Sequence, residues 1–160
     1  MKDKVNLVKG LPARYRKQLA QTYYDAFGSK IGIMLKPQSK TIKLLASALN
    51  TDNGFYALKG PRLVGFLGFE SKGNAYSDFN YRNLKQVFGF WKAALVSVIW
   101  QLAAYRGLKP GQVLIDAFAV VEGQRSQGIG TDLFEAFLDY AGQCGYGEVL
   151  LEVIDTNTRA

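Results

Sequence analysis

Residues that can pack in a core recur along the chain with two periods, and each period predicts a kind of secondary structure. The first stretch, KVNLVKGL, is typical of a short strand, and Pro12 follows it at a place that suits the first turn of a helix. The residues that then recur at helical spacing are Tyr15, Leu19, Thr22, Tyr23, Ala26 and Phe27. We expect Gly28 to end this helix, because glycine commonly follows the last helical residue. A second helix over 39–49 has on one face Ile42, Leu45, Ala46 and Leu49.

The middle and the end of the chain contain strand patterns separated by turn signals. GFYALKGPRLVGFLGFE has two β-rich runs divided by residues 59–62, Lys-Gly-Pro-Arg, which is typical of a hairpin. QVLIDAFAVV is apolar on both faces, as expected of a central buried strand, and EVLLEVID predicts a further strand near the C-terminus. Between these two strands, residues 130–144 predict a helix, and its apolar stripe consists of Leu133, Phe134, Phe137, Leu138 and Ala141.

One segment is apolar over nearly the length of a membrane span. From Val87 to Tyr105 the residues that are not apolar are Gly89, Lys92, Ser97 and Gln101. The lysine inside the segment and the glutamine near its end argue against a helix that crosses a bilayer. We therefore expect a mostly buried helix or helix pair over the core, with a membrane-surface or partner-binding role as the alternative.

The residue types in the chain limit its chemistry. With 160 residues, we expect one domain over 1–160. The single cysteine, Cys144, excludes an intramolecular disulfide, and the chain has no histidine, which is the commonest metal ligand and general base. We therefore expect no metal site and no serine–histidine triad. The N-terminus has no apolar run long enough for a signal peptide, which together with the lone thiol favours the cytoplasm.

The net charge of +7 is unevenly distributed along the chain. Residues 1–110 carry 18 Lys and Arg against 5 Asp and Glu, a net +13, while residues 111–160 carry 2 against 8, a net −6. Such a division is compatible with an anionic ligand, a nucleic acid or a membrane surface, and equally with a solvated basic surface.

A glycine-rich loop joins the central strand to the last predicted helix. Gly128 and Gly130 allow backbone conformations closed to other residues and a close approach of a ligand. The backbone N–H groups at a helix start attract phosphate, and Arg125 can add a charge-assisted hydrogen bond. The loop matches neither the Walker A pattern, since no lysine precedes Thr131, nor the dinucleotide fingerprint. A tight turn without a ligand is the alternative.

The C-terminal part of the chain resembles the acetyl-CoA-binding half of the Gcn5-related N-acetyltransferase (GNAT) superfamily. The family signature, Arg/Gln-x-x-Gly-x-Gly/Ala between a central strand and a helix, is met by Arg125, Gly128 and Gly130. Ala119 near the end of the strand, and Asn157 in the segment LEVIDTNTRA, also match. Residues 114–160 match closely, whereas residues 1–110 match only in the order of their elements.

This resemblance implies an α/β fold: a central, twisted mixed sheet with flanking helices and a helical insertion around 83–106. It also implies transfer of an acetyl group from acetyl-CoA to an amine. The central strand would pair with the pantetheine arm, so that Phe118, Ala119 and Val120 lie beside the thioester and Asn157 lies near the pantetheine. The pyrophosphate would be held by the loop and the helix start: Arg125, Ser126, Gln127, Gly128, Ile129, Gly130 and Thr131.

The implied reaction needs an acceptor for the proton of the amine. Without histidine, that acceptor is a carboxylate or acts through water. Asp116 has the same strand parity as Phe118 and Val120, so we expect it to face the same cleft. Glu70, at the end of GFLGFE, is the other candidate. A structural carboxylate bonded to the backbone is the alternative for Asp116.

Members of this superfamily commonly continue after Asn-x-x-Ala through a tyrosine-bearing helix and a final strand pair, whereas this sequence stops at Ala160. We expect either a fragment or a protein whose last strands are missing or come from another subunit. A homodimer is therefore one of the alternatives. The alternatives to an acetyltransferase are a non-catalytic CoA-binding or regulatory module, and a basic membrane-surface or nucleic-acid-binding protein. As partner we expect an amine substrate, with no nucleic acid and no membrane association.

Overall fold

The computed structural model describes residues 4–31, 35–104 and 107–152. Within these residues one sheet has the strand order β1-β2-β3-β4-β5. The strands are β1 (Val5–Lys9), β2 (Gly54–Lys59), β3 (Arg62–Ser71), β4 (Gln112–Val120) and β5 (Glu148–Leu151). From β1 to β4, each strand pairs antiparallel with the next strand in the chain. β5 pairs parallel with β4. The expected mixed sheet and the hairpin between β2 and β3 are confirmed.

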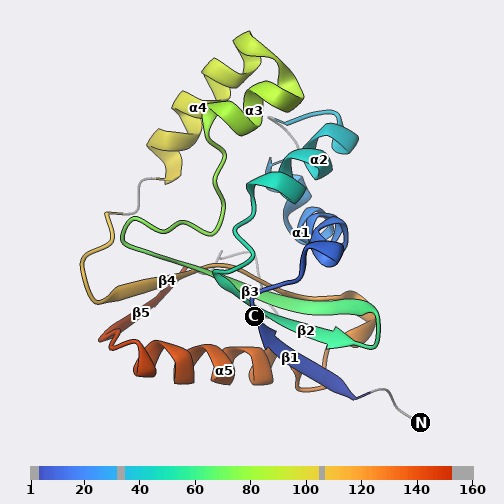
Figure 1. The fold of residues 1–160 in the computed structure, drawn as a ribbon, viewed down its shortest axis with the longest axis vertical. Helices are drawn as coiled ribbons and strands as arrows, with labels where there is room; N and C mark the ends of the chain where they lie inside the picture. The colour runs from blue at the N-terminus through green and yellow to red at the C-terminus, as the bar shows by residue number, and fades with distance from the viewer. Residues whose placement is uncertain (1–3, 32–34, 105–106, 153–160) are drawn as a thin grey trace.

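Helices cover both faces of this sheet (Figure 1). One face is covered by α5 (Ile129–Gln143), and the other by α1 (Arg16–Ile31) and α2 (Gln38–Ala48). α3 (Tyr81–Phe88) and α4 (Phe90–Ala104) lie beyond α2, at the end of the molecule farthest from α5. Two 3-10 turns are η1 (Ala13–Tyr15) and η2 (Glu122–Gln124). A hydrophobic cluster fills each face: Tyr56 and Phe66 lie on the α1 side, and Leu67 and Phe137 on the α5 side.

Three details of the helices differ from the expectations. Gly28 does not end α1, which runs on to Ile31; a Cβ at Gly28 would lie 3.0 Å from the Tyr24 ring, so glycine makes room for that ring inside the helix. The buried face of α2 is rotated from the predicted one and consists of Thr41, Leu44, Leu45 and Ala48. In α5, Leu138 is exposed although its spacing placed it in the apolar stripe.

The apolar segment forms the expected helix pair, divided at Gly89, whose φ of 82° is left-handed. The expectation that it is mostly buried is wrong for α4. Ala93, Val96 and Ser97 face the core, but Trp91 and Leu102 are 84% and 78% exposed. α4 packs mainly against α3, so its outer side has no covering element among the described residues. Among these residues, no helix combines the length and the apolarity that crossing a bilayer requires.

A β-bulge interrupts the pairing of β3 with β4. Gly68 pairs with Ala117 and Phe69 with Ile115, so Asp116 is the extra residue on β4. The bulge resets the alternation of the strand: Phe118 packs on the α5 side, as Ile115 does, whereas Ala117 packs on the α1 side. The argument from strand parity that joined Asp116 to Phe118 is therefore wrong, because an extra residue separates them.

Candidate functional site

In the described part of the chain, the second half of β4 pairs with a strand on one side only. β4 pairs with β3 as far as Val120, which is opposite Gly65. Its pairing with β5 covers Gln112 to Ile115 only. Among the described residues, β4 from Asp116 to Val120 therefore has a partner strand on one side only, and its other edge presents backbone N–H and C=O groups to an extended ligand.

The loop after β4 makes a tight turn directly beyond this edge. The Val121 N–H donates to the Val64 carbonyl at 2.9 Å, which fixes the start of the loop against β3. Ser126 (φ 59°) and Gly128 (φ 82°) are both left-handed. The first helical hydrogen bond runs from the Asp132 N–H to the Gly128 carbonyl at 2.9 Å. Such a turn leaves the first N–H groups of α5 without acceptors inside the helix, at its positive end.

The space around these glycines is open. A Cβ on Gly128 would meet no atom within 4 Å, and a Cβ on Gly130 would lie 3.7 Å from Phe118 Cζ and from Val120 Cγ2, an ordinary van der Waals distance. Neither glycine is needed to avoid a clash with the protein. The buried Ile129 anchors the helix start to the sheet. The loop therefore fits a phosphate group that approaches the backbone closely.

Most side chains of the loop are in solvent. The Arg125 Nε donates to the Val120 carbonyl at 3.0 Å, so this guanidinium lies across the end of β4. The Gln127 amide donates to the Gly123 carbonyl at 3.4 Å. Ser126 and Thr131 are exposed. Arg125 and the two hydroxyl groups supply donors to an anion held by the backbone. Asn157, which the resemblance assigned to the pantetheine, lies outside the described residues.

The Asp116 carboxylate lies on the α1 side of the sheet, among hydroxyl groups. It accepts a hydrogen bond from Ser77 Oγ at 3.2 Å. Burial, and then the nearby Asp116 charge, raise the pKa of Tyr23 above its usual value. Burial also raises the pKa of Tyr76, and it raises that of Tyr56, whose OH is 3.5 Å from the Tyr76 OH, to about 12. The three phenols therefore stay protonated near neutral pH and serve as donors rather than bases.

Glu70 lies on the same side of the sheet and lines a pocket of about 970 Å³. A Cβ on Gly68 would point at the Tyr76 ring, and Glu70 follows two residues later on the same face. The pocket lies between the end of α2, the loop after β3 and the segment before β4. Its charged lining residues are Arg16, Glu70, Lys72, Asp78 and Lys109.

The sequence did not point to the hydroxyl groups around Asp116. Tyr23 belongs to α1, and Tyr76 and Ser77 precede α3, so only the folded chain brings them to β4. In the sequence these tyrosines are ordinary core aromatics at helical or strand spacing. No local pattern would have identified them. The loop that starts at Arg125, by contrast, consists of neighbouring residues and can be found as a sequence motif.

A mixed sheet whose strand β4, in the described part of the chain, pairs on one side only beyond Ile115, followed by a left-handed turn into a helix, is the arrangement expected of the acyl-CoA-dependent N-acyltransferases. The family model described as Acetyltransferase (GNAT) family matches residues 18–160, and the chain belongs to this family. It is an N-acetyltransferase that moves an acetyl group from acetyl-CoA to an amine. The resemblance seen in the sequence, the fold class and the use of acetyl-CoA are thereby confirmed. Within the described residues, no group of three or more Cys, Asp or Glu is placed to hold a metal ion.

Solved structures support the fold at low sequence identity. Ribosomal-protein-alanine N-acetyltransferase from Brucella melitensis biovar Abortus 2308 is 15% identical with a TM-score of 0.56, over 96% of this chain and 82% of that one. Aminoglycoside N-acetyltransferase AAC(6')-Iy in complex with CoA is 11% identical with a TM-score of 0.59, over 97% and 80%. Ard1 from Thermoplasma volcanium is 15% identical with a TM-score of 0.56, over 97% and 75%. No curated protein sequence matches the chain.

Proposed function

We propose that the loop and helix start over 125–131 hold the pyrophosphate of acetyl-CoA, and that the open edge at Phe118, Ala119 and Val120 aligns its pantetheine arm, with Asn157 beside it. One observation carries this proposal: among the described residues the pairing of β4 with β5 ends at Ile115, and the left-handed turn at Gly128 follows the end of β4. The chain thus offers an extended ligand a strand to pair with, and offers the phosphates at the end of that ligand a row of N–H groups.

Asp116 is our candidate for the proton acceptor. Acetyl-CoA, when bound, supplies the activated acetyl group. The amine attacks only in its neutral form, so a base must remove a proton from the incoming ammonium group. The bulge projects Asp116 from the open half of β4, and Ser77 Oγ holds one carboxylate oxygen in place. The buried phenols of Tyr23 and Tyr76 cannot take this proton, since each is already protonated.

The pocket beside Glu70 is our candidate for the acceptor site. It opens on the same side of the sheet as Asp116, and Glu70 and Asp78 give it two carboxylates to which an ammonium group can bind, beside three cationic side chains. We propose a primary amine of a small molecule or of a protein as the substrate. We further propose a single catalytic domain over 1–160 that works in the cytoplasm, in keeping with its exposed free thiol at Cys144.

A thermal shift experiment tests the cofactor site, using acetyl-CoA, CoA and ATP as ligands. The informative variant is Gly128→Glu, which puts a carboxylate into the proposed phosphate cradle. Its matched control is Gly145→Glu: both glycines have a positive φ and open space for a side chain, but Gly145 follows the other end of α5. The backbone strain of the two variants is therefore similar.

Both CoA species should raise the melting temperature of the wild type and of Gly145→Glu, but not that of Gly128→Glu. ATP, which has phosphates without a pantetheine arm, should give a smaller shift. If CoA stabilises Gly128→Glu as well as it stabilises the control, the loop does not hold the pyrophosphate and the proposal is wrong.

A further inference from the structure

The outer side of α4 is apolar where a helix in water would be polar. The α4 patch consists of Phe90, Trp91, Leu95, Val98, Ile99 and Leu102, all between 41% and 84% exposed. Trp91, Leu95, Val98 and Leu102 follow one another at helical spacing, so they form a continuous stripe. The inner side, by contrast, buries the polar Ser97, which donates to the Ala94 carbonyl at 3.0 Å. A contiguous apolar patch of this kind marks an interaction surface.

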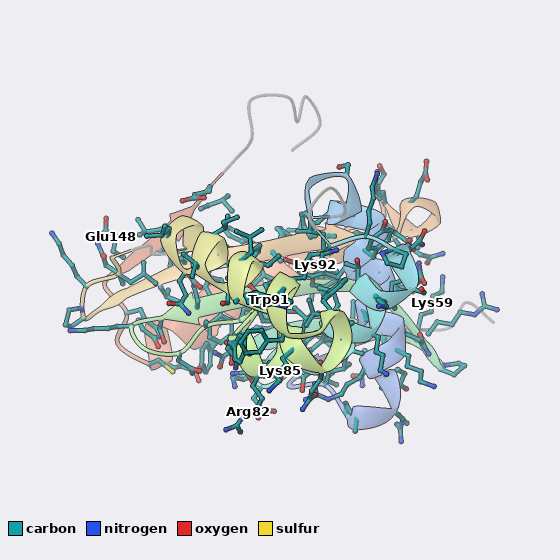
Figure 2. The ribbon with its side chains drawn as sticks, turned by 90° about the horizontal axis from the view of Figure 1, so that it is seen from above. Lys59, Arg82, Lys85, Trp91, Lys92 and Glu148 are labelled. Atoms are coloured by element: carbon teal, nitrogen blue, oxygen red, sulfur yellow. The ribbon has the colours of Figure 1, made fainter. Side chains whose placement is uncertain are left out.

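The helices at this end of the molecule carry cations and no carboxylate. α2, α3 and α4 together contain the basic residues Lys40, Lys43, Arg82, Lys85 and Lys92, and these helices contain no Asp or Glu. In Figure 2, which looks down on this end of the molecule, Arg82 and Lys85 lie to one side of Trp91 and Lys92 to the other. Lys85 Nζ is 6.0 Å from the centre of the Phe90 ring, and that ring is 5.2 Å from the ring of Trp91.

The opposite end of the molecule has the opposite charge. α5, on the other face of the sheet in Figure 1, exposes Asp132, Glu135 and Asp139 and contains no Lys or Arg. A negatively charged surface therefore attracts the α4 end of the molecule and repels the α5 end. The charge distribution favours one orientation, with the α4 patch in contact.

We propose that the α4 patch and its basic surround dock on the surface of an anionic lipid bilayer. An apolar helix face with Trp and Phe enters the boundary between headgroups and acyl chains, and flanking Lys and Arg pair with anionic headgroups. The sequence led us to expect no membrane association, and Lys92 and Gln101 argued against a helix that crosses a bilayer. Both residues are compatible with a helix that lies on a membrane without crossing it.

Charge favours the bilayer over a second copy of the chain. A two-fold symmetric dimer through the α4 patch would bring the same basic residues of both subunits together. This repulsion opposes the apolar contact, whereas an anionic bilayer adds attraction to it. A nucleic acid would satisfy the cations but would leave the α4 patch exposed to water.

Vesicle binding tests the proposal directly, with vesicles of phosphatidylcholine alone or mixed with phosphatidylglycerol. The chain has two tryptophans, so Trp100→Phe leaves Trp91 as the only tryptophan reporter. The Trp91 emission should shift to the blue with the anionic vesicles, and the protein should sediment with them. Replacing Trp91, Leu95 and Leu102 together by Ser should abolish the sedimentation. These side chains contact solvent, and a melting curve shows whether the triple variant is folded.

A pair of charge variants separates the proposed surface from general attraction. Arg82→Gln with Lys85→Gln should weaken binding to the anionic vesicles roughly 30-fold, given about 1 kcal/mol for each cation near the surface. Lys59→Gln with Arg62→Gln makes the same change of net charge at the β2–β3 hairpin, and Figure 2 shows Lys59 well apart from Trp91. This control should bind as the wild type does.

Three results would overturn the proposal: no binding to anionic vesicles, equal weakening by both charge variants, or a dimer in solution that the triple Ser variant dissociates. The last result would assign the α4 patch to a second copy of the chain. None of these measurements uses acetyl-CoA, so their failure leaves the proposed cofactor site untouched.

Discussion

Two glycines of the loop, two residues apart, should respond in opposite ways to the same substitution. Gly130 lies in the first turn of α5, and a Cβ there makes only ordinary contacts with Phe118 and Val120 at 3.7 Å. Alanine is favoured over glycine inside a helix by about 0.5–1 kcal/mol, so Gly130→Ala should raise the free energy of unfolding by about that amount. Gly128 has a φ of 82°, and an alanine held in this left-handed conformation costs about 1–2 kcal/mol. Gly128→Ala should lower the stability accordingly.

Both variants should nevertheless bind CoA more weakly. A methyl group on either residue stands where the proposed pyrophosphate approaches the N–H groups of the helix start. The loss of one hydrogen bond to a charged group is worth about 1.5–3 kcal/mol, which corresponds to roughly 10- to 150-fold in the dissociation constant. Gly130→Ala is the decisive variant, because its expected gain in stability rules out unfolding as the reason for weak binding.

Urea unfolding and isothermal titration with CoA provide the two measurements. The matched control is Gly142→Ala, which lies near the end of the same helix with open space for a Cβ. It should share the gain in stability and keep the wild-type affinity. A Gly130→Ala variant that is stabilised and binds CoA as tightly as this control would refute the reasoning, since the backbone there would then not contact the ligand.

Two further predictions concern the α1 side of the sheet. Asp116→Asn should lower kcat by about 10²- to 10⁴-fold and leave the affinity for CoA unchanged; steady-state rates and CoA titration check this, and a defect in CoA affinity alone would contradict it. Tyr56→Phe should flatten the loss of stability at high pH. Folding raises the pKa of Tyr56 to about 12 through burial, so below pH 10 both states are protonated, whereas between pH 10 and 12 only the unfolded state ionises. The wild type should lose about 1.4 kcal/mol per pH unit more than the variant in this window, and equal slopes in urea unfolding would argue against it.

The features that could be predicted from the sequence are those that contiguous residues determine. The hairpin at 59–62 and the turn from β4 into α5 follow from glycine and proline signals within a few residues. That the loop from Arg125 to Thr131 binds phosphate also follows from neighbouring residues, and it stays a prediction. Local patterns of this kind do not depend on what packs against them.

The features that were missed depend on distant parts of the chain. The bulge at Asp116 is a property of the pairing between β3 and β4, so strand parity alone assigned its side chain to the wrong face. The exposure of Trp91 and its neighbours depends on whether another element covers α4, which no periodicity reveals. The Ser77 hydroxyl contacts Asp116, and the Asp116 charge acts on Tyr23, only through the packing of α1 and of the segment before α3.

The bulge lets β4 carry the Asp116 carboxylate without changing which of its other residues pack in the core. Val113 and Ile115 before it, and Phe118 and Val120 after it, contribute to the same hydrophobic cluster on α5, as they would if Asp116 were absent and the strand alternated regularly. Asp116 is thus an insertion that adds a carboxylate without displacing a core residue. An exchange or deletion of this one residue therefore removes the carboxylate while the residues of β4 that face the core keep their sides of the sheet.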